Sequence, residues 1–588
     1  MILPRPLRPF GLVPLAPALL ASACVPPPNA AVAPPPASPV GAAAQGVVLD
    51  SPGLVSAADP RAAEAGAQML RLGGSATDAA IATMLALTVV EPQSSGIGGG
   101  GFLVLGDAAG HVETIDGRET APKAATPQWF YVDGKPLPYG EAIPGGRSVG
   151  VPGNLRLAAM AHNGKGKLSW RTLFQPAIRL AREGFAITPR LNSILAAASR
   201  TGALDPDARA LYYAADGKPL PVGTLVRNPA LAATLETIAA RGADSFYTGD
   251  NATMIASKVG TAPRNPAPLT TADLAAYRAI GRPAVCGEYR AYRICGMGPP
   301  SSGATTVFAI LKQLERFDLK ALGPVSPVAW HLIAESQRLA YADRDQYLAD
   351  SDFVSVPVAG LTDPAYLAGR SALISEGSTL PSVQPGTPPG ATLAFAAAPR
   401  QDEQGTTHFV AVDRWGNATS YTSTIEGPFG SGLMVGGYYL NNELTDFNIV
   451  PDRDGKPIAN RVEGGKRPRS SMAPTLIYGP DGKLRLAIGA AGGVTIPAQV
   501  AKAIIGVLDW NLSAREAIAL PVIFAPGGDM VFVEKGTSLE AMTPALQQLG
   551  HGQVIARSPS FKANAIERAG DRWRGAADPR SEGAAIAP

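Results

Sequence analysis

The sequence predicts an α/β protein layered as an αββα sandwich, and three features of the chain carry this prediction. Ser75-Ala76-Thr77-Asp78 forms a capping box before the apolar stretch 79–90, which predicts a buried helix. Strand-like runs at 475–478 and 484–488 precede a helical pattern from about Pro497 to Trp510. A third pair of strand-like runs occupies 406–425. Strands with buried helices on both sides are typical of layered α/β architectures.

The first residues have the three parts of a secretory signal. Arg5 and Arg8 precede a modest apolar segment, 12–20, and small residues follow at 21–23. Such an order of positive, apolar and small residues marks a segment that is removed on export, and it is too short to span a membrane. We therefore predict a signal peptide over 1–23.

Cys24 follows the small residues directly, as the lipidated cysteine of a bacterial lipoprotein does. Ala21 is a weaker match than the usual leucine, so lipidation of Cys24 and simple cleavage both stay open. Residues 24–47 are rich in Pro and Ala and are expected to form an extended tether. These features place the protein in the periplasm or cell envelope, with any membrane attachment made only through the lipid.

Further elements follow from local signals along the chain. Ser326-Pro327 predicts a helix running to about Asp350, with serine as the cap and proline at the first position. Residues 376–400, rich in Pro, Ser, Gly and Ala, are expected to form a surface loop. Ser513-Ala514-Arg515-Glu516 predicts the cap of a late helix.

The runs 406–412 and 418–425 form a predicted hairpin with unusual chemistry. If Arg414-Trp415-Gly416 is a three-residue loop with Gly416 at positive φ, Val412 pairs with Ala418 and Thr424 lies opposite Thr406. A two-residue loop would place Ile425 there instead.

Thr406 directly follows Gly405 and could cut its own backbone. Its Oγ would attack the Gly405 carbonyl, and water would release a new terminus carrying both a nucleophile and an amine base. The alternative is an ordinary hairpin, because threonine is common in strands.

Composition excludes several other classes. The formal net charge is only +3 and no long run has one sign, which argues against nucleic-acid binding. Five histidines show no ligand spacing, so no metal and no cofactor are expected. Gly96–Gly101 follows a helix and precedes a strand, the reverse of a nucleotide-binding loop. Cys286 and Cys295 are either disulfide-bonded in an oxidising compartment or two small buried residues.

Blocks along nearly the whole chain after residue 48 resemble the γ-glutamyltransferases, also called glutathione hydrolases. The blocks, in chain order, are Glu91-Pro92-Gln93-Ser94-Ser95-Gly96, Gly117-Arg118-Glu119-Thr120-Ala121-Pro122, Pro299-Pro300-Ser301-Ser302-Gly303, Thr406-Thr407-His408-Phe409, Phe429-Gly430-Ser431-Gly432, Leu440-Asn441-Asn442-Glu443-Leu444-Thr445-Asp446-Phe447, Lys466-Arg467-Pro468-Arg469-Ser470-Ser471-Met472, Ala491-Gly492-Gly493 and Asp578-Pro579-Arg580-Ser581. The resemblance implies the αββα fold of N-terminal nucleophile hydrolases and a precursor that cleaves itself. The large subunit would be 48–405 and the small subunit 406–588.

The resemblance also implies roles for individual residues. Thr406 would be the nucleophile and Thr424 its hydrogen-bonding partner, with Gly405-Thr406 as the cleaved bond. The remaining roles are an oxyanion hole at Gly492 and Gly493, a grip on the donor α-carboxylate by Arg118, Ser470 and Ser471, and a grip on its α-ammonium by Glu443 and Asp446. Glu426 stands where the family usually has asparagine, adding a third carboxylate.

The implied activity is transfer or hydrolysis of γ-glutamyl groups from glutathione or related compounds, with water or an amino acid or dipeptide as acceptor. Two alternatives remain. One is an amidase with the same machinery, such as a cephalosporin-type acylase, and the other is an unprocessed, surface-anchored binding lipoprotein.

Overall fold

The computed structural model describes residues 48–49, 53–392, 394–397, 405–558 and 561–588. The chain divides into two units, Met1–Gln45 and Gly46–Pro588, and the second contains every described residue. The predicted signal peptide, Cys24 and the tether lie outside the described residues. Across the described part of the chain, no helix is both long enough and apolar enough to cross a membrane.

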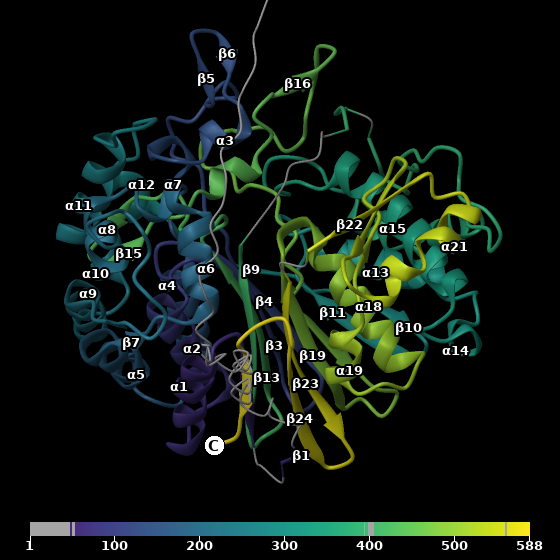
Figure 1. The fold of residues 1–588 in the computed structure, drawn as a ribbon, viewed down its shortest axis with the longest axis horizontal. Coiled ribbons are helices and arrows are strands. Elements are labelled where there is room, and N and C mark those ends of the chain that lie inside the picture. Colours follow the sequence, from purple (N-terminus) through teal and green to yellow (C-terminus); the bar gives the residue numbers. More distant parts are fainter. Residues whose placement is uncertain (1–47, 50–52, 393, 398–404, 559–560) are drawn as a thin grey trace, which may run out of the picture. The chain divides into compact units, whose positions relative to one another are not determined.

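Two seven-stranded antiparallel sheets form the middle layers (Figure 1). In spatial order the first contains β1 (Val48–Leu49), β24 (Arg572–Ala577), β23 (Lys562–Ala569), β19 (Leu484–Ala491), β18 (Thr475–Tyr478), β11 (Tyr292–Gly296) and β10 (Val285–Tyr289). The second contains β25 (Ala584–Ile586), β2 (Leu54–Ala57), β12 (Thr407–Val412), β13 (Ala418–Thr424), β3 (Gly100–Gly106), β4 (Val112–Gly117) and β9 (Ile280–Arg282).

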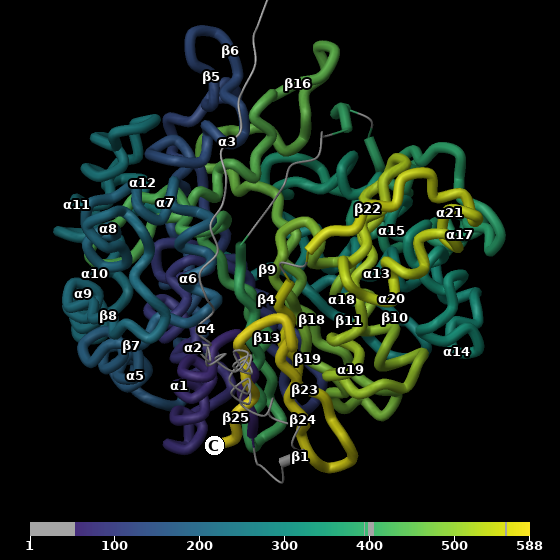
Figure 2. The backbone as a smooth tube through the Cα atoms, viewed as in Figure 1, coloured from purple at the N-terminus to yellow at the C-terminus, as the bar shows by residue number. Residues whose placement is uncertain are grey.

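Helices cover the outer face of each sheet, as the tube view shows (Figure 2). On the side of the second sheet lie α1 (Pro60–Arg71), α2 (Ala76–Val90), α4 (Asn154–Lys165), α5 (Trp170–Glu183) and α6 (Pro189–Ala197), with α9 (Pro229–Arg241) and α11 (Gly249–Gly260) farther out. Next to the first lie α13 (Gly303–Leu314), α15 (Pro327–Tyr347), α17 (Pro364–Ser371), α18 (Ile496–Leu508) and α19 (Ala514–Ala519).

The remaining helices are short: α3 (Tyr139–Ala142), α7 (Ser199–Gly202), α8 (Pro206–Tyr212), α10 (Asp244–Tyr247), α12 (Thr271–Ala276), α14 (Leu319–Leu322), α16 (Val358–Leu361), α20 (Ser538–Ala541), α21 (Thr543–Gln548) and the 3-10 turns η1 (Gly146–Ser148), η2 (Glu443–Asp446) and η3 (Gly493–Thr495). The remaining strands are β5 (Tyr131–Val132), β6 (Lys135–Pro136), β7 (Phe185–Ala186), β8 (Leu225–Val226), β14 (Met434–Val435), β15 (Tyr438–Tyr439), β16 (Asp452–Arg453), β17 (Lys456–Pro457), β20 (Ile523–Phe524), β21 (Met530–Glu534) and β22 (Gln553–Arg557).

Strand β12 is buried on both faces, and its side chains divide between two hydrophobic cores. Phe409 and Ala411 pack with the helices around α2. Val410 and Val412 pack between the two sheets, in the core that continues to α13, α15 and α18. This division explains why the run reads as continuously apolar rather than alternating, and it confirms the αββα prediction.

The predicted helix caps are confirmed. The capping box at Ser75 and Asp78 opens α2, and Ser326 caps α15. The capping box at Ser513 and Glu516 opens α19. Strand β19 continues three residues beyond the predicted end, to Ala491, because it pairs with β23 up to Lys562.

The predicted hairpin register is confirmed. Val412 pairs with Ala418, and Thr407 pairs with Ser423, so the next positions out are Thr406 and Thr424. Gly416 has φ of 82°, as the three-residue loop requires. Elsewhere, Cys286 and Cys295 form a disulfide between β10 and β11.

Candidate active site

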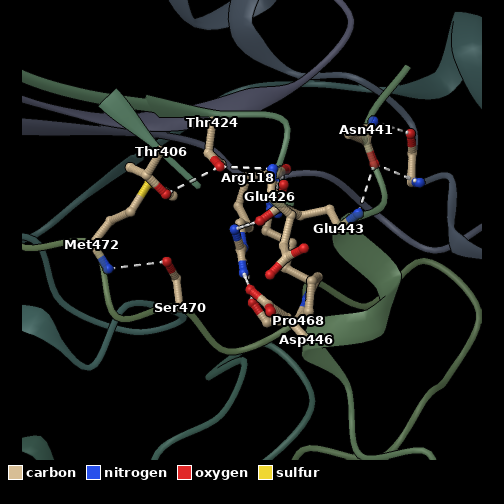
Figure 3. Close-up of polar contacts among 12 residues, drawn as sticks. Arg118, Thr406, Thr424, Glu426, Asn441, Glu443, Asp446, Pro468, Ser470 and Met472 are labelled. Carbon is tan, nitrogen blue, oxygen red and sulfur yellow. Dashed lines mark hydrogen bonds and ion pairs between the residues drawn. The ribbon is translucent and has the colours of Figure 1, made fainter. Parts of the chain in front are cut away.

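Two threonine hydroxyls meet at the open end of the hairpin. Thr406 Oγ1 donates to Thr424 Oγ1 at 3.2 Å, and both side chains are buried. Thr424 Oγ1 also accepts from the backbone N–H of Glu426 at 2.7 Å (Figure 3). The N–H of Glu426 therefore fixes the Thr424 hydroxyl, and this hydroxyl in turn orients Thr406 Oγ1.

The backbone around this pair adopts left-handed conformations. Gly405 has φ of 105°, but Thr406 and Glu426 also lie at positive φ, 82° and 71°. Such angles are costly for side chains with a Cβ, above all for a β-branched residue. The strain therefore lies at the bond between Gly405 and Thr406, where the sequence predicts cleavage.

The glycine run before β3 packs closely against this end of the hairpin. A Cβ at Gly99 would lie 1.9 Å from the carbonyl oxygen of Thr424, so only glycine fits. The carbonyl of Gly99 in turn accepts from the N–H of Asn154 at 3.0 Å. The run thus fixes the position of Thr424.

Arg118 lies at the centre of a buried charged cluster (Figure 3). Its guanidinium forms ion pairs with the carboxylates of Glu443 and Asp446, both on η2. Nε and Nη2 also donate to the carbonyls of Pro468 and Arg469, at 3.1 and 3.0 Å. Burial lowers the Arg118 pKa, but the two carboxylates outweigh burial and hold it above its ordinary value.

Two further carboxyl groups belong to the same region. Glu426 accepts a hydrogen bond from the amide of Asn442. Glu119 is fully buried, and burial together with the nearby Glu443 carboxylate raises its pKa well above the ordinary value. Arg118 is the guanidinium that balances the carboxylates on η2.

The two predicted serines have different surroundings. Ser470 Oγ accepts from the N–H of Met472 at 3.2 Å, and the Ser470 carbonyl accepts from Ser302 N at 2.8 Å. Ser471 Oγ accepts from a guanidinium nitrogen of Arg344 at 2.5 Å. Arg344 Nε also donates to Ser302 Oγ at 2.9 Å, so a second buried guanidinium orients Ser471.

Gly492 and Gly493 connect β19 to the helical turn η3 and to α18. Their φ angles are 131° and 56°, and the Gly492 carbonyl accepts from Thr495 Oγ1 at 2.7 Å. N–H groups at the beginning of a helix point outward without intrahelical partners and carry partial positive charge. This geometry suits an anion-stabilising turn.

Sequence reasoning missed three members of the cluster, although two had a signal. Glu119 follows Arg118, and Asn442 precedes Glu443, within blocks already recognised. Arg344 lies in the middle of α15, and no local pattern sets it apart from a solvated helix residue. Among the described residues, no group of three or more His, Cys, Asp or Glu side chains could hold a metal ion.

Fold and site together define an enzyme of the N-terminal nucleophile hydrolase type, with two facing sheets between helices and a threonine hydroxyl before a central strand. The gamma-glutamyltranspeptidase family model matches residues 62–588. The chain therefore belongs to the γ-glutamyltranspeptidase family.

The chain is similar both to relatives named glutathione hydrolase and to relatives named acylase. It is 36% identical over 554 residues to the glutathione hydrolase proenzyme of Bacillus subtilis (strain 168), which covers 91% of each chain. It is 35% identical over 517 residues to the acylase ACY 1 proenzyme of Pseudomonas sp. (strain SE83), covering 87% of this chain and 88% of the relative. The crystal structure of cephalosporin acylase from Bacillus halodurans superposes with a TM-score of 0.82 at 26% identity, covering 94% of this chain and 99% of that one.

Proposed function

We propose that this protein is a self-cleaving γ-glutamyltransferase and glutathione hydrolase, with Thr406 as the nucleophile of both cleavage and turnover. The observation that carries this proposal is the Thr406–Thr424 hydroxyl pair, 3.2 Å apart, at a strained glycine–threonine bond. Membership of a family whose relatives bear the name proenzyme supports the cleavage.

In the cleavage step, Thr406 Oγ attacks the carbonyl carbon of Gly405 while Thr424 Oγ1 accepts its hydrogen bond. The hydroxyl proton passes to the peptide nitrogen, the C–N bond of Gly405 breaks, and the nitrogen becomes the α-amine of Thr406 while the acyl group of Gly405 is transferred to the threonine oxygen. Water then hydrolyses this ester. The products are the large subunit, 48–405 with the tether before it, and the small subunit, 406–588.

In the turnover step, the free α-amine of Thr406 accepts the hydroxyl proton, since an unperturbed α-amine has a pKa of about 7.7–8.0. Oγ attacks the γ-amide carbonyl of the donor, the amine product leaves, and a γ-glutamyl ester remains on Thr406. Backbone N–H groups at Gly492 and Gly493 stabilise the oxyanion, and one such donor is worth about 2.7–4 kcal/mol. Water or an acceptor amine completes the reaction.

The charged cluster around Arg118 supports a donor that carries an α-amino acid group. Arg118 already pairs with Glu443 and Asp446, so the site holds a guanidinium and carboxylates side by side. A zwitterion can exchange into such a cluster, with its carboxylate on Arg118 and the Ser470–Ser471 hydroxyls and its ammonium on Glu443, Asp446 and Glu426. A planar guanidinium suits this bidentate grip.

The other part of the proposal concerns location. The segment 1–23 would direct export to the periplasm or cell envelope, and Cys24 would add a lipid anchor if it is modified. The enzyme would then act on glutathione or another γ-glutamyl compound outside the cytoplasm.

A second candidate function is favoured by the acylase relatives. An acylase of this type would cleave itself in the same way but prefer a donor without the α-ammonium. Three carboxylates around Arg118, rather than neutral side chains, favour the γ-glutamyl donor.

The test combines amino-terminal sequencing with two chromogenic anilides. A fragment beginning Thr406-Thr407-His408 with faster release from the γ-glutamyl anilide would support the proposal. The same fragment with preference for the glutaryl anilide would instead support the acylase. A single uncut chain without release would contradict both.

A further inference from the structure

A buried lysine on the facing sheet reaches the end of the hairpin that carries Thr406. Lys562 begins β23, opposite Ala491 of β19. Its ammonium donates to both oxygens of Glu91, at 2.9 and 2.8 Å, and to Ser94 Oγ at 2.9 Å. All three N–H groups are thus used, and the ion pair is shielded from water, with both side chains at most 4% exposed.

The two partners of Lys562 connect it to both strands of the hairpin. Glu91 Oε2 also accepts from Thr407 Oγ1 at 3.0 Å, one residue after the nucleophile. The carbonyl of Ser94 accepts from the N–H of Ile425 at 3.3 Å, one residue after Thr424. Glu91 and Ser94 belong to the expected large subunit, whereas Lys562 and the hairpin belong to the expected small subunit.

We propose that Lys562 is a positioning residue for Thr406. Through Glu91 and Ser94 it fixes the two segments that bring the hydroxyls of Thr406 and Thr424 together, and it neutralises Glu91 close to the amine that cleavage creates. This inference rests on the proposed function, because it takes Thr406 as the nucleophile.

The charges around the α-amine of Thr406 affect its pKa, which can be measured independently of whether the chain folds. A buried carboxylate without its cation would favour the ammonium form of a nearby amine and raise its pKa. Burial lowers the pKa of Lys562 to about 8, while Glu91 opposes this shift. Arg190, Asp59 and Asp578 are the charged groups near Lys562. On the hairpin, His408 contacts Thr422 Oγ1, and the N–H of Glu426 donates to Thr424 Oγ1.

The decisive experiment is the pH profile of kcat/KM for a γ-glutamyl anilide in variants of the full chain. In Lys562→Met, we expect the acid limb to move to higher pH by about 0.5 unit or more, because Glu91 loses its cation. In the double variant Glu91→Gln/Lys562→Met, the limb should return to the wild-type position. A merely structural lysine would not produce this reversal.

A second variant measures positioning without touching the ion pair. Thr407→Val has nearly the same shape but loses the hydrogen bond to Glu91, and we expect self-cleavage to slow about tenfold, the effect of one such bond. This variant remains informative if Lys562→Met does not fold.

Lys502 provides the matched control. It is also a buried lysine, with a pKa lowered by burial to about 7, but its ammonium donates to the carbonyls of Ile518 and Leu520, both at 2.8 Å. Lys502→Met should not move the acid limb.

Wild-type cleavage in Thr407→Val together with an unmoved acid limb in Lys562→Met would overturn the inference while leaving the proposed function intact. A wild-type chain that stays uncut would overturn both.

Discussion

The two ends of the β12–β13 hairpin are built in opposite ways. At the turn, Asp413 Oδ1 accepts from the N–H groups of Trp415 and Asn417, both at 3.0 Å. Asp413 Oδ2 accepts from Asn417 Nδ2 and from the N–H of Ala76 at the start of α2, again at 3.0 Å. Positive φ falls on Gly416, where it costs little. Apart from the bond to Ala76, the contacts that form this end are made within five consecutive residues.

At the other end, positive φ falls on Thr406 and Glu426, which do have side chains. The segments that hold them come from far along the chain, including the Gly99 loop, Glu91 and Lys562. Backbone strain persists only where surrounding structure over-determines it, and such places are commonly reactive. The same pair of strands thus carries a relaxed turn at one end and a strained bond at the other. The comparison implies that changes at the open end alter chemistry, whereas changes at the turn alter stability.

The largest expected effect is that of Thr406→Ala. Because this change removes the nucleophile of both reactions, we expect one uncut chain and no anilide release. Thr406→Ser is the control, since it keeps a hydroxyl and should be cut. Gel electrophoresis with amino-terminal sequencing checks both variants, and two fragments from the alanine variant would contradict self-cleavage by Thr406.

Gly405→Ala should slow self-cleavage strongly. A Cβ there would lie 1.5 Å from the carbonyl oxygen of Glu426, and φ of 105° is unfavourable for alanine. Strain of about 1–3 kcal/mol corresponds to a rate loss of about 5- to 160-fold. The cleavage rate is followed on gels.

The molecules of this variant that do mature provide its internal control. Their kcat should equal that of the wild type, because cleavage has by then separated residue 405 from Thr406. Cleavage at the wild-type rate would show that the backbone at Gly405 has no part in the reaction.

Arg118→Ala should destabilise the fold as well as weaken donor binding. It leaves Glu443 and Asp446 buried without their cation, and breaking a buried pair costs about 3–5 kcal/mol. Denaturant unfolding measures the loss, and the KM for a γ-glutamyl anilide should rise.

A matched triple variant separates the two effects of Arg118. Arg118→Met/Glu443→Gln/Asp446→Asn removes all three charges, so it should recover stability without recovering the KM. Unchanged unfolding in the single variant would mean that the ion pairs contribute nothing to the fold.

Acid should destabilise the protein through His408, which lies on β12 two residues after Thr406. Burial lowers its pKa to about 3, whereas the unfolded chain has a histidine pKa of about 6.5. The unfolded state therefore binds more protons between these values, and stability falls as pH drops from about 6.5 toward about 3, by about 1.4 kcal/mol per unit.

Unfolding free energies of the wild type and of His408→Gln, measured across this pH range, check the prediction. The difference between the two should shrink as pH falls, because only the wild type has the buried imidazole to protonate. A difference that does not change with pH would exclude His408 as the cause.

The smallest expected effect is that of Asp413→Ala at the turn. The lost hydrogen bonds should cost about 1–3 kcal/mol, while the rate of self-cleavage should not change. Asp413→Asn keeps one carbonyl oxygen and should lose less. Thermal unfolding and gels measure the two quantities, and a slowed cleavage would show that the two ends of the hairpin are coupled.

Much of the architecture follows from local signals in the sequence. Ser75, Ser326 and Ser513 cap helices where predicted, because a side-chain oxygen satisfies the first free N–H groups irrespective of the rest of the fold. The hairpin register followed from one glycine in a short loop. Ordered blocks along the chain identified the family and indicated Thr406, Arg118 and η2 as parts of one site.

Tertiary structure alone decided how those residues meet. No spacing in the sequence predicts that Arg118 pairs with Glu443 and Asp446, that Arg344 orients Ser471, or that Lys562 holds Glu91. These contacts join residues more than one hundred positions apart, and they depend on how two sheets pack. Local sequence determines caps, turns and strand pairing because their forces act within a few residues. Buried charge is placed by the whole fold, because only the fold decides which distant groups lose water together.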